Sequence, residues 1–185
     1  MGLGGCNSAK DLTRILNVLR DAAIYDIFAQ TCLHEFIKKS INGECDLDDI
    51  LTNLPEGKIT LRVFLETRNM LSPLYLVETK RNANRALVRN LIKETFRITQ
   101  SYCTNSSQYD KLENMEWYQF TRLMVNSLSH DFRWEFRSKD EKFLPVEYKG
   151  ISIQLDQKGR NLQMKLQTMV DLVDEIIEFT KSDII

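Results

Sequence analysis

The stretch Ser8-Ala9-Lys10-Asp11-Leu12-Thr13-Arg14-Ile15-Leu16 predicts the start of a long helix and, with it, a helical fold. Ser8 and Asp11 have the spacing of a capping box, in which two side chains satisfy backbone N–H groups at a helix N-terminus. Apolar residues then recur at helical spacing, at Leu12, Ile15, Leu16, Leu19, Ala23, Ile27 and Phe28. We therefore predict an amphipathic helix that continues to about Ser40 and ends at Asn42-Gly43.

Two more long helices are predicted by the same kinds of signal. Ser72-Pro73 combines an N-cap residue with a proline at the first helical position, and the helix that it opens is expected to reach about Gln100. After a loop over residues 103–110, helical periodicity predicts another helix over about 112–129. A shorter helix is predicted over residues 59–70.

The period of the apolar residues changes after Pro145, from helical spacing to alternation. The alternating positions are Val146, Tyr148, Ile151, Ile153, Leu155, Leu162, Met164 and Leu166. Lys149-Gly150 and the stretch 156–159 separate them as turns, so we predict a β-hairpin or meander within about 144–166. A last amphipathic helix is expected over about 167–181. The predicted fold is mainly α: one domain over residues 1–185, a bundle of four to five helices with this small β appendage before the C-terminal helix.

Composition limits the classes of function that the chain can have. Its 185 residues are 43% hydrophobic and 28% charged with a net charge of -1, so no overall field draws it to nucleic acid or to anionic lipid. No apolar run approaches the roughly 20 residues that a membrane-spanning helix needs. Four scattered cysteines, with no C-x-x-C pair, suit free thiols in a reducing cytoplasm. Without a Gly-rich phosphate loop or an H-E-x-x-H motif, we expect a cytoplasmic protein with no cofactor and no metal.

A candidate site lies at the end of the helix predicted over 112–129. Arg122, Asn126 and His130 are spaced four apart, so one helix would carry them on one face. A guanidinium, an amide and a base-capable ring in this order suit phosphate binding and proton transfer. The alternative is a polar helix end whose side chains bond neighbouring carbonyls. His34, the other histidine, has no second ligand-type residue at a suitable spacing and is interpreted as structural.

A row of cations marks the helix that begins at Ser72-Pro73. Arg81, Arg85, Arg89, Lys93 and Arg97 follow one another at every fourth position. Because four residues exceed one helical turn, the row drifts by about 40° per step around the helix. Two interpretations stay open: a solvated flank paired with acidic neighbours, or an RNA-binding track of Arg85, Arg89, Lys93 and Arg97 that contacts phosphates.

The segment Val125-Asn126-Ser127-Leu128-Ser129-His130 resembles the signature of the HEPN superfamily, which are small helical-bundle proteins that include many metal-independent endoribonucleases. That signature is an arginine, often followed by a polar residue, with a histidine four to six residues beyond the arginine. Asn126 and His130 are in register with it, and Val125 occupies the arginine position. The resemblance covers roughly Trp117 to the C-terminus and, in helix order, the whole chain.

The resemblance implies a metal-independent endoribonuclease or RNA-processing protein of a prokaryotic defence or stress system, such as toxin–antitoxin or phage defence. His130 and Asn126 would be catalytic, with Arg122 or Arg133 in place of the missing arginine. The implied partners are a second copy of the chain, RNA, and an antitoxin or another protein. The alternative is a non-catalytic module of the same fold that acts through dimerisation or a partner.

Overall fold

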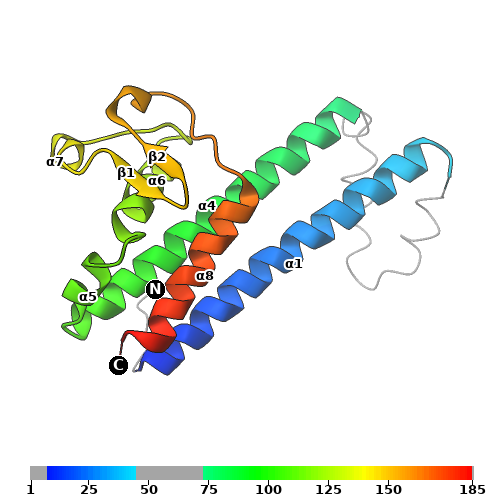
Figure 1. Ribbon diagram of the computed structural model, residues 1–185. Coiled ribbons are helices and arrows are strands. Elements are labelled where there is room, and N and C mark those ends of the chain that lie inside the picture. Colours follow the sequence, from blue (N-terminus) through cyan, green and yellow to red (C-terminus); the bar gives the residue numbers. More distant parts are fainter. Residues whose placement is uncertain (1–7, 45–72, 185) are drawn as a thin grey trace. The chain divides into compact units, whose positions relative to one another are not determined.

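The computed structural model describes residues 8–44 and 73–184, and these ranges are mainly helical (Figure 1). They contain six α-helices and one two-stranded antiparallel sheet that precedes the C-terminal helix, which confirms the predicted fold class. The helix predicted over 59–70 lies outside the described residues. None of the helices in the described ranges is long and apolar enough to span a bilayer.

The chain divides into two compact units. Of the described residues, the larger unit contains 8–22 and 88–184, and the smaller one contains 23–44 and 73–87. Helices α1 (Ala9–Ile41) and α4 (Pro73–Asn105) each contribute residues to both units. Because each unit is described by itself, the prediction of a single domain stays a prediction.

Both predicted starts of the long helices are confirmed. At α1 the backbone N–H of Asp11 donates to Ser8 Oγ at 3.2 Å, which satisfies one of the donors that a helix N-terminus leaves unpaired. α4 begins at Pro73, whose missing N–H costs nothing at a first helical position. α4 continues to Asn105, so the predicted loop over 103–110 begins three residues later than expected.

The core of the larger unit lies between the first turns of α1, the second half of α4, α6 (Tyr118–Ser129) and α8 (Leu166–Ser182). Within this unit, α8 runs beside the first turns of α1 (Figure 1), and Thr13 Oγ1 lies 2.9 Å from Thr180 Oγ1. Phe96 of α4 packs on Tyr118 of α6 with ring centroids 5.7 Å apart. This α4–α6 contact fixes the two helices that carry most of the candidate residues.

The single helix predicted over 112–129 is wrong, because the chain forms two helices there. α5 (Tyr109–Glu113) and α6 are separated by a tight turn, in which the Tyr118 N–H donates to the Met115 carbonyl at 2.9 Å. The turn allows Trp117, which is 2% exposed, to pack edge-on against Phe179 of α8 at 5.7 Å. Burial of the Trp117 indole stabilises the fold more than the helical hydrogen bonds that the turn interrupts would.

Of the two predicted forms, a hairpin or a meander, the described residues contain the hairpin. β1 (Val146–Tyr148) pairs antiparallel with β2 (Ile151–Ile153), with Val146 opposite Ile153. Lys149 and Gly150 both have positive φ angles, 45° and 77°, as a two-residue hairpin turn requires. After the 3₁₀ turn η2 (Leu155–Gln157), the third alternating run forms no strand, because the Leu162 N–H bonds the Phe132 carbonyl in a loop instead.

Two of the four cysteines lie in the described residues, and both are free thiols. Cys32 is exposed, whereas Cys103 is fully buried in the larger unit. Burial raises the pKa of the Cys103 thiol to about 11, which keeps it protonated at neutral pH. Cys103 is therefore a packing residue rather than a nucleophile.

Candidate functional site

The end of α6 determines where the candidate residues lie. The helix ends at Ser129, and His130 is its C-cap, with φ -110° and ψ 48°. Asp131 and Phe132 follow with φ of 54° and 58°, the left-handed region that non-glycine residues rarely adopt. Arg122 and Asn126 therefore share a helix face, whereas His130 lies beyond the helix and does not continue that face.

Burial of alternating aromatic residues explains this reversal of the chain. Phe132, Trp134 and Phe136 are 8%, 6% and 3% exposed, as core residues are. Trp134 is also held through its backbone, since its N–H donates to the Arg160 carbonyl at 2.9 Å. The apolar area that these rings bury offsets the strain of two left-handed residues, about 1–3 kcal/mol each.

Asn126, on α6, stabilises this reversal of the chain by a hydrogen bond. Its Nδ2 donates to the Glu135 carbonyl at 2.6 Å and so ties α6 to the segment that returns from the turn. This bond is the one that the alternative interpretation of the sequence expected, an amide that satisfies a neighbouring carbonyl. Asn126 therefore has a structural role.

Arg122 is held in place by three neighbours. Its Nη1 donates to Asp140 Oδ1 at 2.5 Å and its Nε to Gln119 Oε1 at 2.9 Å, while its Cζ lies 5.3 Å from the ring centroid of Phe143. The remaining nitrogen, Nη2, is buried and has no hydrogen-bond acceptor within the described residues. The guanidinium is thus fixed in orientation, and one of its three nitrogens has no acceptor among the described residues.

Asp140 is the buried partner that fixes Arg122. It is 2% exposed, and its Oδ2 also accepts the backbone N–H of Arg137 at 2.9 Å, at the start of the short helix α7 (Ser138–Glu141). Burial by itself would raise the pKa of this carboxyl, but the hydrogen bonds from Arg122 and from the Arg137 backbone lower it below the usual value. Asp140 is therefore ionised at neutral pH and forms a charged pair with Arg122.

Arg122 and Asn126 line a pocket of about 400 Å³ in the larger unit, between α4, α6 and α7. Its wall contains five cationic side chains, Lys93, Arg97, Arg122, Arg137 and Lys139, and two carboxylates, Glu94 and Asp140. We call this the basic pocket. Its volume lies in the range of small-ligand sites, about 300–1,000 Å³.

Ion pairs inside the wall neutralise only part of this charge. Arg97 Nη2 lies 2.6 Å from Glu94, and Arg122 is paired with Asp140. The other three cations, Lys93, Arg137 and Lys139, form no ion pair in the part of the chain that the structure describes. Three unpaired positive charges around one hollow attract an anion, because a concave low-dielectric wall concentrates their field.

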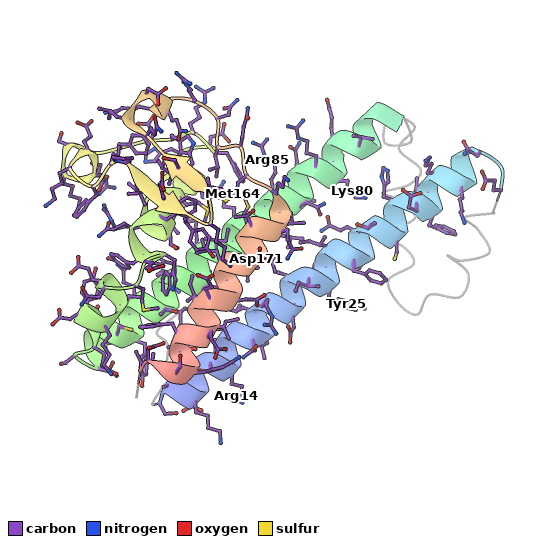
Figure 2. All side chains as sticks on the ribbon, in the orientation of Figure 1. Arg14, Tyr25, Lys80, Arg85, Met164 and Asp171 are labelled. Carbon is purple, nitrogen blue, oxygen red and sulfur yellow. The ribbon has the colours of Figure 1, made fainter. Side chains whose placement is uncertain are left out.

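The predicted cation row is thus divided. Lys93 and Arg97 line the basic pocket, Arg89 does not, and Arg85 belongs to the smaller unit, where Figure 2 places it on α4. The 40° drift of the row explains why neighbouring members differ in surroundings. Two sets of residues that the sequence suggested separately, one on α4 and one on α6, therefore meet at one site.

The remaining predicted residues lie outside this pocket. His130 and Arg133 are exposed, and neither is among the residues of its wall. The Arg133 backbone forms an isolated β-bridge with Asn161. Val125, which stands where the HEPN signature has arginine, is itself in the pocket wall and supplies an apolar surface there.

Sequence reasoning missed Arg137, Lys139 and the buried Asp140. The available signal was the charged run 137–142, in which five of the six residues after Phe136 carry a charge. Its position opposite α6 depends on the left-handed turn at Asp131 and Phe132, which the periodicity of apolar residues does not reveal.

The sequence matches no protein-family model, no curated protein and no solved structure.

Proposed function

We propose that this chain is a HEPN-like RNA-binding protein that holds a phosphate of the RNA backbone in the basic pocket. The observation that carries the proposal is the group of five cations around a hollow of about 400 Å³, three of them without a carboxylate partner in the described residues. Phosphate contacts by Lys and Arg supply most of the affinity of sequence-independent RNA binding.

The chemistry of the wall suits a phosphodiester. Lys93, Arg137 and Lys139 supply mobile charge, and Arg122 supplies a guanidinium held in one orientation by Asp140. A fixed guanidinium recognises the planar arrangement of phosphate oxygens better than a flexible ammonium does. Val125 and Phe96 in the same wall offer apolar contacts to a sugar.

A metal-independent endoribonuclease is the second candidate. One observation favours it: His130 is exposed and directly follows the helix that carries Arg122 and Asn126. An imidazole there would serve as general base or acid only if a bent RNA strand or a second copy of the chain brings the 2′-hydroxyl to it. Binding without cleavage requires no such addition, and it is therefore the function that the geometry supports best.

The salt dependence of RNA binding tests the proposal. Fluorescence anisotropy with a labelled single-stranded RNA, measured across salt concentrations, gives the slope of log K against log salt. Arg137→Ala/Lys139→Ala should weaken binding and reduce that slope by about one to two units, because two phosphate contacts are lost.

The matched control removes two cations of the same unit that lie away from the pocket. Lys10 and Arg14 are exposed on the first turns of α1, where Figure 2 labels Arg14. Lys10→Ala/Arg14→Ala should leave the slope within about half a unit of the wild type. An equal effect of both double variants would mean that RNA responds to overall charge only, and the proposal would be rejected.

A further inference from the structure

The charge of the basic pocket exceeds the charge of one backbone phosphate. Its wall contains five cationic side chains and only two carboxylates, so its formal net charge is +3. An internal phosphate of a nucleic-acid strand carries a single negative charge. One such group in the pocket would therefore leave two positive charges of the wall without a counter-charge.

The size of the pocket limits how many phosphate groups can enter it. A volume of about 400 Å³ lies near the lower end of the range for sites that bind one small ligand, about 300–1,000 Å³. Successive phosphates of a strand are separated by a whole nucleoside, so a pocket of this size accommodates one phosphate with its sugar. A ligand that matches the wall is therefore expected to carry its additional negative charge on the same phosphorus atom.

The unpaired cations of the wall come from two segments of the chain. Lys93 belongs to α4, whereas Arg137 and Lys139 lie at the start of α7. These three side chains form no ion pair with any residue that the structure describes. A phosphomonoester offers three terminal oxygens as acceptors, one more than a phosphodiester of the backbone. Three cations thus correspond to three oxygens.

The neutral polar side chains of the wall already bond within the protein. Asn126 donates to the Glu135 carbonyl at 2.6 Å, and Ser129 donates to the carbonyl four residues before it at 3.0 Å. Gln100 donates to the hydroxyls of two tyrosines at 3.4 and 3.5 Å. Sequence-specific recognition needs hydrogen bonds to the edges of bases. The wall is therefore better suited to recognise the charge of a phosphate than the identity of a base.

We infer that the basic pocket recognises a phosphomonoester, the terminal phosphate of an RNA strand. Such a group carries between about −1.5 and −2 charges at neutral pH. Lys93, Arg137 and Lys139 contact its oxygens, and the apolar side chains of the wall contact the terminal sugar. The inference rests on the proposed function and specifies that a phosphate at a strand end binds more tightly than one inside the strand. A free nucleoside monophosphate presents the same chemical group.

Anisotropy titrations with matched RNAs test the inference. The reference is an internally labelled single-stranded RNA with hydroxyl groups at both ends. A phosphate at its 5′ or 3′ end should tighten binding about tenfold, as expected for charge-assisted hydrogen bonds. A methyl ester of the 5′-phosphate, which removes one charge and one terminal oxygen, should gain less than threefold.

Two controls separate the terminal phosphate from its alternatives. A hydroxyl-ended strand that is two nucleotides longer adds as much charge as the terminal phosphate does, and it should gain less than twofold. Displacement of the phosphorylated RNA by AMP, and not by adenosine, at concentrations near the Kd of that RNA would identify a free nucleotide as the source of the phosphomonoester. Displacement only at far higher AMP concentrations would identify the strand end.

Two variants make the test specific to the pocket. Arg137→Ala/Lys139→Ala replaces two exposed side chains and should reduce the tenfold preference to less than twofold, while Lys10→Ala/Arg14→Ala should retain it. Equal binding of hydroxyl-ended and phosphorylated RNA by the wild type, or equal losses in the two variants, would overturn the inference. RNA binding that is independent of the strand end would leave the proposed function in place, whereas no binding of any of these RNAs would reject both.

Discussion

Neighbouring residues fix the position of the Arg122 side chain but do not use all of its hydrogen-bond donors. Asp140 and Gln119 hold the guanidinium by hydrogen bonds, and the Phe143 ring covers its plane, while Nη2 is left without an acceptor in the described residues. Such a group is already oriented before a ligand arrives, so less conformational entropy is lost on binding. The residue that holds Arg122 therefore matters as much as Arg122 itself.

The Asp140 carboxyl should make the free energy of unfolding depend on pH in the acidic range. Its pKa is lower in the folded protein than in the unfolded chain, so its contribution is complete above the unfolded value, about 4, and disappears as the pH falls through the folded value. Urea unfolding at pH 7 should show that Asp140→Asn costs about 1–3 kcal/mol, since a charged hydrogen bond in a buried place is lost.

The same variant provides the control for the pH dependence. Between pH 5 and pH 2.5 the unfolding free energy of the wild type should fall more steeply than that of Asp140→Asn, because the variant lacks the carboxyl. Identical slopes in the two proteins would show that Asp140 is not the group whose ionisation stabilises the fold.

His130 is the residue that decides between binding and catalysis. If the chain cleaves RNA, the reaction should proceed in EDTA and leave a 2′,3′-cyclic phosphate, and His130→Ala should lose about 100-fold in rate, as expected for loss of a general acid or base. Arg122→Ala or Arg133→Ala should also be impaired, whichever replaces the missing arginine. Electrophoresis of labelled RNA, with end-group analysis of the products, gives the measurement.

His34→Ala is the control for this experiment, since His34 lies in the smaller unit and is interpreted as structural. It should cleave as fast as the wild type. Varied RNAs left uncut with and without metal, or cleavage by His130→Ala at the wild-type rate, would exclude the enzyme and leave the binding function.

At the scale of elements, α4 connects the two predicted sets of residues. Phe96 packs on Tyr118, and this contact places Lys93 and Arg97 of α4 beside Arg122 of α6. Lys93→Glu/Arg97→Glu should therefore reduce the salt slope of RNA binding by at least one or two units. Anisotropy titrations check this, with Arg89→Glu on the same helix as the control, since Arg89 lies outside the pocket wall.

Helix starts were predictable because capping is local. The Ser8–Asp11 spacing and the Ser72-Pro73 pair depend only on neighbouring residues, as does the Lys149-Gly150 hairpin turn. The break between α5 and α6 was not predictable, because it depends on the contact of Trp117 with Phe179, 62 positions apart in sequence. Contacts of this kind have no periodicity to reveal them.

The sequence identified individual residues of the candidate site, but it did not predict that they lie together. Arg122, Asn126, Lys93 and Arg97 were singled out by spacing, yet their meeting depends on the packing of α4 against α6. The helical face assigned to His130 ends one residue too early, since Asp131 and Phe132 turn left-handed to bury the aromatic residues that follow. Tertiary burial overrode local helical preference at this point.

At the scale of the whole molecule, we predict a homodimer in which the helix bearing Asn126, and His130 after it, lies near the two-fold axis. The motivation is the HEPN resemblance, together with the exposure of His130 at the end of α6. Multi-angle light scattering at high micromolar concentration should give about twice the 21.7 kDa of one chain. A mass of one chain at that concentration would count against the dimer and, with it, against catalysis shared between two copies.

Photocrosslinking to RNA tests most directly whether the basic pocket is the RNA-binding site. A single-stranded RNA that contains 4-thiouridine is irradiated with the full chain at low salt, and mass spectrometry locates the crosslinked peptides. We predict crosslinks concentrated in residues 93–100 of α4 and in 122–140, and their loss in Arg137→Ala/Lys139→Ala. Crosslinks concentrated elsewhere, such as around Lys10 and Arg14, or a pattern that this variant leaves unchanged, would contradict the account.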